Sequence, residues 1–284
     1  MRVLPKPNID PIEVFRSCSI GVRAAELRIR FQSIEPLIGL AAAAYDDAAS
    51  RGCLYELAAD DHIGSVTGEE MIQLYTRRLV RKGSPARRYY DELLSSPEFG
   101  TCPLCGVGMA GSLDHHLPKN IFPSLAVSPI NLVPACLRCN HEKLDAFEPR
   151  QDSQTIHPYY DDFEQDRWIF AEVVHLTPPA LVFSAVPPPG WSPVLQAKAI
   201  NHFKELSLGP LYAAQAGNEL ANLKTVLSEL LLQDGPDGVR NHLRLCLRTY
   251  EDRLLNSWQA AFYRALVNDE WFHRDGVEGI DSGS

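Results

Sequence analysis

Hydrophobic and polar positions along the chain predict a mostly helical structure with one strand-forming interruption. The pattern favours helices from residue 12 to 95 and again from 192 to 269. Two apolar, β-branched runs, Trp168–Leu176 and Ala180–Val186, are separated by Thr-Pro-Pro and predict a short pair of strands. The predicted fold class is therefore mainly α, with a short β hairpin in the second half of the chain.

Local signals mark where several of these helices begin and end. The capping-box sequence Thr-Gly-Glu-Glu at 67–70 predicts a helix to about residue 82, and Ser-Pro at 84–85 predicts another to about residue 95. Gly-Pro and Asp-Gly-Pro-Asp-Gly sequences divide the C-terminal part into three predicted helices. These are 193–207, 210–233 and 237–268.

Leucines recur at helical spacing in the second of these C-terminal helices. Such a stripe must pack against something, either the chain's own helices, which we favour, or an oligomerisation bundle. The leucines are Leu220, Leu223, Leu227, Leu230 and Leu231.

Composition and charge narrow the class of protein. With 284 residues and 45% hydrophobic content, the chain can form two or three modules with real cores. It has no run of 18 apolar residues and no apolar stretch after its first methionine, so we expect a soluble, cytoplasmic protein with reduced cysteines and no membrane contact. Residues 151–284 hold 10 basic and 18 acidic groups, which accounts for −8 of the net −9.

An acidic protein repels a polyanion at long range, so any nucleic-acid contact requires local basic surface. A basic cluster followed by two tyrosines is the candidate, since guanidinium groups can grip phosphates and a tyrosine can stack on a base. An alternative that we weigh equally is that the cluster is a solvated helix face, whose charges pair with Asp91 and Glu92. The cluster comprises Arg77, Arg78, Arg81, Lys82, Arg87 and Arg88, with Tyr89 and Tyr90.

Two cysteine pairs carry the strongest chemical signal. Cys102-Pro-Leu-Cys105 and Cys136-Leu-Arg-Cys139 lie 30 residues apart, a spacing that lets four thiolates bind one Zn²⁺ ion tetrahedrally. Three further cysteines are isolated and predict small core residues, namely Cys18, Cys53 and Cys246.

A zinc ion with four thiolates has no open position and cannot itself activate water. If the protein is an enzyme, a second ion must therefore be held by other groups. Asp114 offers a carboxylate oxygen and Asn140 a carbonyl oxygen, which suit Mg²⁺ or Mn²⁺ better than zinc.

These elements together resemble the HNH endonuclease family, in the order CPLC at 102–105, DHHLP at 114–118 and NLVPACLRCNHEK at 131–143. The resemblance covers only about residues 100–150. It implies a ββα-metal finger with a first strand at 113–117 and a helix that starts near Cys136 and runs through Leu137–Phe147. The predicted domains are an N-terminal helical region, 1–97, a nuclease module, 98–150, and a mostly helical C-terminal region, 151–284, with the strand pair near 168–186.

Residue roles follow from the resemblance, position by position. His115 is the expected general base, and Asp114 and Asn140 are the expected ligands of the catalytic ion. Asn131 is expected to orient the hairpin loop, and Lys143, which shares a helix face with Asn140, to contact the phosphate. His116 follows His115 on a strand and should face away from the ion as a packed residue. Many family members have a histidine where this chain has Asn140, with His141 next.

The predicted function is a metal-dependent HNH endonuclease that hydrolyses phosphodiester bonds in DNA. Many HNH proteins with similar helical flanks serve in bacterial restriction or anti-phage defence, beside a partner ATPase or sensor protein. The resemblance therefore implies such a role for this chain. One alternative is a non-catalytic zinc module that binds nucleic acid or a partner protein. A second keeps the chemistry and changes the substrate to RNA, since one ion and one histidine can hydrolyse either backbone.

Overall fold

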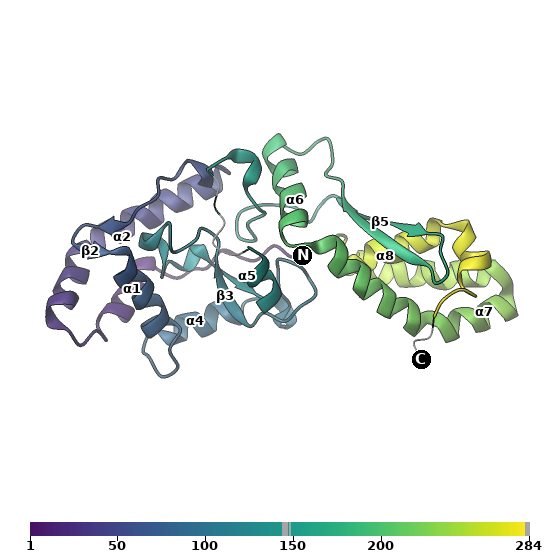
Figure 1. Cartoon of the computed structure of the whole chain (residues 1–284), viewed down its shortest axis with the longest axis horizontal. Helices are drawn as coiled ribbons and strands as arrows, with labels where there is room; N and C mark the ends of the chain where they lie inside the picture. The colour runs from purple at the N-terminus through teal and green to yellow at the C-terminus, as the bar shows by residue number, and fades with distance from the viewer. Residues whose placement is uncertain (144–146, 148, 282–284) are drawn as a thin grey trace. The chain divides into compact units, whose positions relative to one another are not determined.

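In the computed structural model, which describes residues 1–143, 147 and 149–281, the chain folds into two compact units. The first spans 1–162 and the second 163–284 (Figure 1). The N-terminal helices and the cysteine-bearing segment both lie in the first unit. They share one core, in which Phe15 and Phe31 from the helices are buried together with Leu113 and Leu132 from the later strands. The cysteine-bearing segment is therefore built into the core of the helical region.

Two helices of the first unit begin at side-chain caps, whereas the helix predicted to start at Ser84-Pro85 begins at Arg87 without one. Asp10 caps the first helix by accepting a hydrogen bond from the backbone N–H of Ile12. Thr67 and Glu70 form the predicted capping box. The helix after it changes to a π-helical stretch, Tyr75–Leu79. The elements are α1 (Pro11–Ser19), α2 (Ala25–Ser50), β1 (His62–Ile63), β2 (Val66–Thr67), α3 (Gly68–Leu74) and α4 (Arg87–Leu94).

A two-stranded antiparallel sheet followed by a short helix carries the residues of interest. Strand β3 (Ser112–His115) pairs with β4 (Leu132–Ala135), and α5 (Leu137–Lys143) follows. The first strand ends two residues earlier than predicted, because both backbone polar groups of Leu117 bond the side chain of Asn131 rather than a neighbouring strand. Phe147 is not helical, so the predicted helix ends before it, and residues 144–146 lie outside the described ranges.

The second unit contains the predicted strand pair. Strands β5 (Ile169–Val174) and β6 (Ala180–Ala185) form an antiparallel hairpin, which packs on the helices of this unit (Figure 1). The predicted helix break at 234–238 is confirmed, because Gly235 has non-helical dihedral angles, φ 70° and ψ −165°, and divides α7 into two helical stretches. The single helix predicted at 237–268 is instead two, since Ser257 caps a new helix. The helices are α6 (Pro193–Glu205), α7 (Leu208–Arg253) and α8 (Trp258–Asn268).

The predicted leucine stripe lies on α7 and packs within this unit. Leu220, Leu223 and Leu227 are buried, and α7 contacts both β6 and α8. This favours packing on the chain's own elements over an exposed oligomerisation stripe. Among the helices in the described ranges, none combines the length and apolarity needed to cross a bilayer.

Candidate functional site

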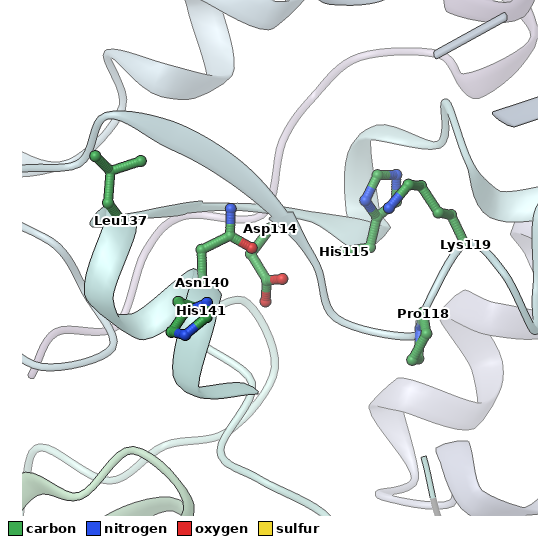
Figure 2. Close-up of a pocket in the computed structure, with 7 residues that line it drawn as sticks. All are labelled: Asp114, His115, Pro118, Lys119, Leu137, Asn140 and His141. Atoms are coloured by element: carbon green, nitrogen blue, oxygen red, sulfur yellow. The ribbon is translucent and has the colours of Figure 1, made fainter. Parts of the chain in front are cut away.

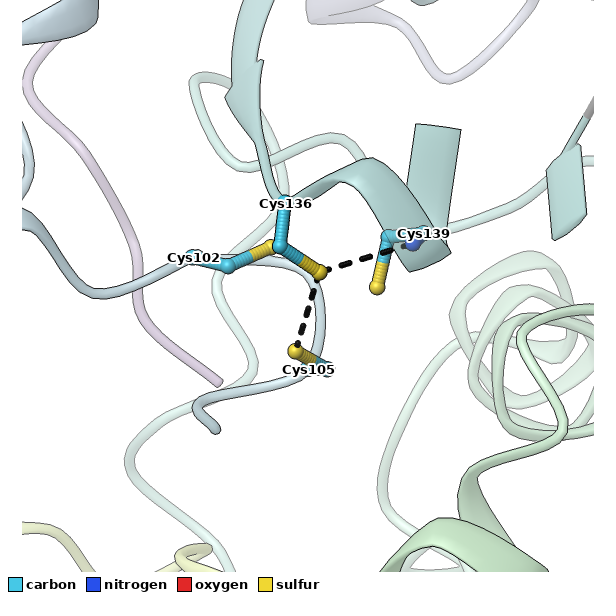
Figure 3. A group of neighbouring side chains, drawn as sticks. All are labelled: Cys102, Cys105, Cys136 and Cys139. Atoms are coloured by element: carbon cyan, nitrogen blue, oxygen red, sulfur yellow. Dashed lines mark hydrogen bonds between the residues drawn. The ribbon is translucent and has the colours of Figure 1, made fainter. Parts of the chain in front are cut away.

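Four cysteine side chains meet at one point in the first unit (Figure 3). Their sulfur atoms all lie within 4.8 Å of one another, and all four residues are buried. A tetrahedral ion with Zn–S bonds of about 2.3 Å places its sulfur ligands about 3.8 Å apart. The Cys105 and Cys136 sulfurs are 3.9 Å apart. The geometry therefore suits a metal such as zinc, as the spacing predicted, and the four-sulfur donor set fits that ion.

Backbone turns around the cysteines explain how the chain brings them together. Gly106 adopts a φ of 68°, which a residue with a side chain rarely adopts, and its N–H donates to the Cys102 carbonyl at 2.8 Å. A Cβ atom on Gly108 would lie 2.8 Å from the Cys136 Cβ, so only glycine lets the two pairs approach this closely. The Gly108 N–H also donates to the Cys105 sulfur.

Hydrogen bonding among the four thiols shifts their acidities in opposite directions. Hydrogen bonding with Cys102 lowers the pKa of Cys105 and lowers the pKa of Cys136 to about 7. Thiolates are the form that binds a metal ion. The isolated cysteines lie elsewhere: Cys18 is buried as predicted, whereas Cys53 and Cys246 are partly exposed.

A polar pocket opens beside the cysteine cluster, and three of the predicted catalytic residues line it (Figure 2). Its volume is about 340 Å³. Strand β3, the turn after it and helix α5 each contribute side chains. The lining residues are Asp114, His115, Pro118, Lys119, Leu137, Asn140 and His141.

Asp114 and Lys143 form a buried ion pair next to this pocket. The Lys143 ammonium donates to the Asp114 carboxylate at 2.7 Å, and the two side chains are 10% and 8% exposed. Burial raises the pKa of Asp114, and the charge of Lys143 opposes that shift. The same ammonium donates to the backbone carbonyls of His115 at 2.6 Å and His116 at 2.9 Å. Lys143 therefore connects the end of α5 to the end of β3.

His115 presents a neutral imidazole to the pocket. Its Nε2 donates to the Ala126 carbonyl at 2.9 Å, and because a carbonyl only accepts, the proton lies on Nε2 and Nδ1 is unprotonated. Burial lowers the pKa of His115 to about 3, so the ring is uncharged at neutral pH. The Tyr75 ring packs edge-on against the imidazole at 4.5 Å between centroids and limits how it can turn.

Two asparagines have different environments. The Asn140 amide nitrogen donates to the Ser112 hydroxyl at 3.0 Å, which leaves its carbonyl oxygen available to the pocket that it lines. Asn131 is fully buried and bonds the backbone N–H and C=O of Leu117, at 2.7 and 3.0 Å. Asn131 therefore holds the connection after β3, and Asn140 is the asparagine at the pocket.

His116 directly follows β3 and is not among the residues that line the pocket. Its ring stacks on that of His157 at 4.0 Å, and both residues are buried. The His157 ring in turn bonds the Tyr45 hydroxyl at 2.8 Å. This is the packed environment that strand alternation predicts for His116, and it supports β3 from behind.

The basic residues predicted to bind nucleic acid have three kinds of environment. Arg87 pairs with Asp91 at 2.8 Å and Arg88 with Glu13 at 3.2 Å, so these two take part in intramolecular ion pairs. Arg78 is half-buried beside Gly21. In the described part of the chain no ion pair involves the last group, which is exposed: Arg77, Arg81 and Lys82.

One pocket residue with a charged side chain, Lys119, was not among the predicted functional residues. Lys119 follows Pro118 in a turn closed by the Ile121 and Phe122 N–H groups, which both donate to the Pro118 carbonyl. Its side chain extends toward the His115 ring (Figure 2). Its position directly after the Asp-His-His-Leu-Pro segment was the only sequence signal available.

Comparison with known proteins places the chain in a phage protein family. It is 30% identical over 309 residues to Protein ea31 of Escherichia phage lambda, with 96% of this chain and 99% of that protein covered. The chain therefore belongs to the family of that phage protein. No protein-family model matches the sequence, and no solved structure matches it.

Proposed function

We propose that this protein is a metal-dependent endonuclease of the HNH type that hydrolyses DNA. The observation that carries the proposal is the meeting of Asp114, His115 and Asn140 at one open pocket beside the cysteine cluster. A purely structural zinc module has no need for an unprotonated imidazole nitrogen next to a carboxylate and an amide oxygen. This is why we rank the non-catalytic alternative below the enzyme.

His115 is the proposed general base. A base must be uncharged before it accepts a proton, and burial keeps the imidazole in that form. The Ala126 carbonyl fixes Nε2 as the donor, so Nδ1 is the atom that takes the proton from water. An imidazole with a pKa of about 3 is a weak base. The negative charge of a bound phosphate would raise that pKa toward the neutral pH range.

Asp114 and Asn140 are the proposed ligands of a catalytic Mg²⁺ or Mn²⁺ ion. Both donor atoms are hard oxygens, and the pocket has room for water and a phosphate oxygen as further ligands. When bound, such an ion neutralises the scissile phosphate and stabilises the leaving oxygen. The cysteine cluster would hold Zn²⁺ in a purely structural role.

The exposed cations Arg77, Arg81 and Lys82 are the proposed contacts to the nucleic-acid backbone. Arg77 lies in the same π-helical stretch as Tyr75, which packs on the pocket histidine, and Arg81 and Lys82 lie shortly after that stretch ends. We further propose a role in restriction or anti-phage defence in the cytoplasm, with a partner ATPase or sensor.

The test is cleavage of supercoiled plasmid by purified protein with Mg²⁺ or Mn²⁺, with a single-stranded RNA as second substrate. His115→Gln should lower the rate roughly a hundredfold or more. His62→Gln is the matched control, because His62 is an exposed histidine of β1 in the same unit. Equal zinc content in both variants shows that folding is preserved. Cleavage that His115→Gln leaves unchanged would refute the assignment, and RNA cleavage alone would change the substrate.

A further inference from the structure

Two lysines reach the candidate site, and their surroundings differ. Lys143 was predicted to contact the phosphate. An ammonium group has three N–H donors, and those of Lys143 have three acceptors within the protein: the Asp114 carboxylate and the carbonyls of His115 and His116. Its side chain is only 10% exposed.

A phosphate contact by Lys143 would therefore have a cost. The phosphate would have to replace one of these acceptors, and either the buried Asp114 carboxylate would lose its counter-charge or a backbone carbonyl would lose its donor. Lys143 is held in a structural role by the same contacts that satisfy it.

Lys119 has the opposite environment. It is half-buried and lines the pocket together with His115 and Asp114 (Figure 2). In the described part of the chain no hydrogen bond or ion pair involves its ammonium group. Its side chain extends toward the His115 ring (Figure 2). A rigid turn after Pro118 supports its backbone.

We infer that Lys119 is the residue that contacts the scissile phosphate. We also infer that Lys143, on α5, is a positioning residue that holds the Asp114 side chain of β3 in place. The inference rests on the proposed nuclease function and names the group that binds the phosphodiester in the pocket. A lysine beside an imidazole and a carboxylate gives an anionic phosphate the partner that an acidic protein must supply locally.

Binding of a short fluorescent DNA duplex, followed by anisotropy over a series of salt concentrations without added divalent ion, tests this directly. A lost phosphate contact reduces the slope of log K against log[salt] by about 0.9, and weakens binding about eightfold at an ionic strength of about 0.1 M. Lys119→Gln should show both effects, and should lower the plasmid cleavage rate about a hundredfold. Lys119→Arg should restore most of the salt slope, because it keeps the charge.

Two controls separate the possible results. Lys204→Gln removes the same charge from an exposed lysine of the other unit and should leave the slope unchanged. Lys143→Gln should leave the slope unchanged as well, and should lower the urea midpoint of the first unit. If the wild-type protein binds and cuts DNA and Lys119→Gln retains the same slope and rate, the inference about Lys119 is overturned and the proposed function stands. Wild-type protein that neither binds nor cuts nucleic acid would overturn the proposed function with it.

Discussion

Asn131 offers a prediction whose size can be worked out from the structure. Its side chain accepts a hydrogen bond from the Leu117 N–H and donates to the carbonyls of Leu117 and Leu125. In Asn131→Ala the Leu125 carbonyl keeps a donor, because the Ser128 N–H also bonds it at 3.1 Å. The two polar groups of Leu117 lose the side-chain partners that the structure gives them.

Each buried backbone group that loses its partner costs about 1–3 kcal/mol, so the loss of partners for two groups should cost the variant about 2–6 kcal/mol of stability. With a urea m-value of about 2 kcal/mol/M, the midpoint of the first unit should fall by about 1–3 M. The loss should lie in the first unit alone, because Asn131 and the two leucines that it bonds all belong to that unit.

The distribution of tryptophan makes the assay specific. All four tryptophans lie in the second unit, at 168, 191, 258 and 271, so their fluorescence reports that unit. Hydrogen exchange of peptides from 112–135 reports the first unit. Asn131→Ala should shift the hydrogen-exchange signal of these peptides and leave the tryptophan transition in place. The control is Asn8→Ala, which changes an exposed asparagine in the same unit and should shift neither signal. A shift below about 0.3 M in the 112–135 peptides would refute the account of these hydrogen bonds.

Two further predictions concern the cysteine cluster and His115. Cys139→Ser, measured by zinc content and by hydrogen exchange of the first unit, should lose the ion and local protection while tryptophan fluorescence stays native, whereas Cys53→Ser should keep both. The pKa of His115 falls from about 6.5 unfolded to about 3 folded, so its contribution to stability is complete above about pH 6.5 and is lost at about 1.4 kcal/mol per pH unit below it. When the pH is lowered from neutral to mildly acidic, the urea midpoint should therefore fall further in wild type than in His115→Gln. Equal falls in the two proteins would contradict a buried neutral imidazole.

Features with a local cause could be predicted from the sequence. The Cys-x-x-Cys pairs predicted a cluster, since each pair needs only one tight turn to bring its sulfurs together. The capping box of Thr67 and Glu70, and the β5–β6 hairpin, likewise depend on neighbouring residues. The oxygen ligands of Asp114 and Asn140 were expected from their chemistry, and the place of His115 beside them was expected from the family resemblance.

Features set by distant packing could not be predicted in this way. Spacing placed Lys143 beside Asn140 and gave no sign that its ammonium reaches across to β3. Which lysine stays available for a ligand depends on contacts that only the folded chain reveals.

Helix α5 shows how the cysteine cluster and the pocket depend on each other. It has seven residues, and a helix of that length is unstable in isolation, so its position must be fixed from outside. Cys136 and Cys139 hold the first turn of α5 in the cluster. Lys143, the last residue of the helix, bonds Asp114 of β3. Asn140 lies between these two attachments and directly follows a cysteine. A bound zinc ion would therefore act on the pocket without touching it, because it fixes the helix that carries the Asn140 oxygen.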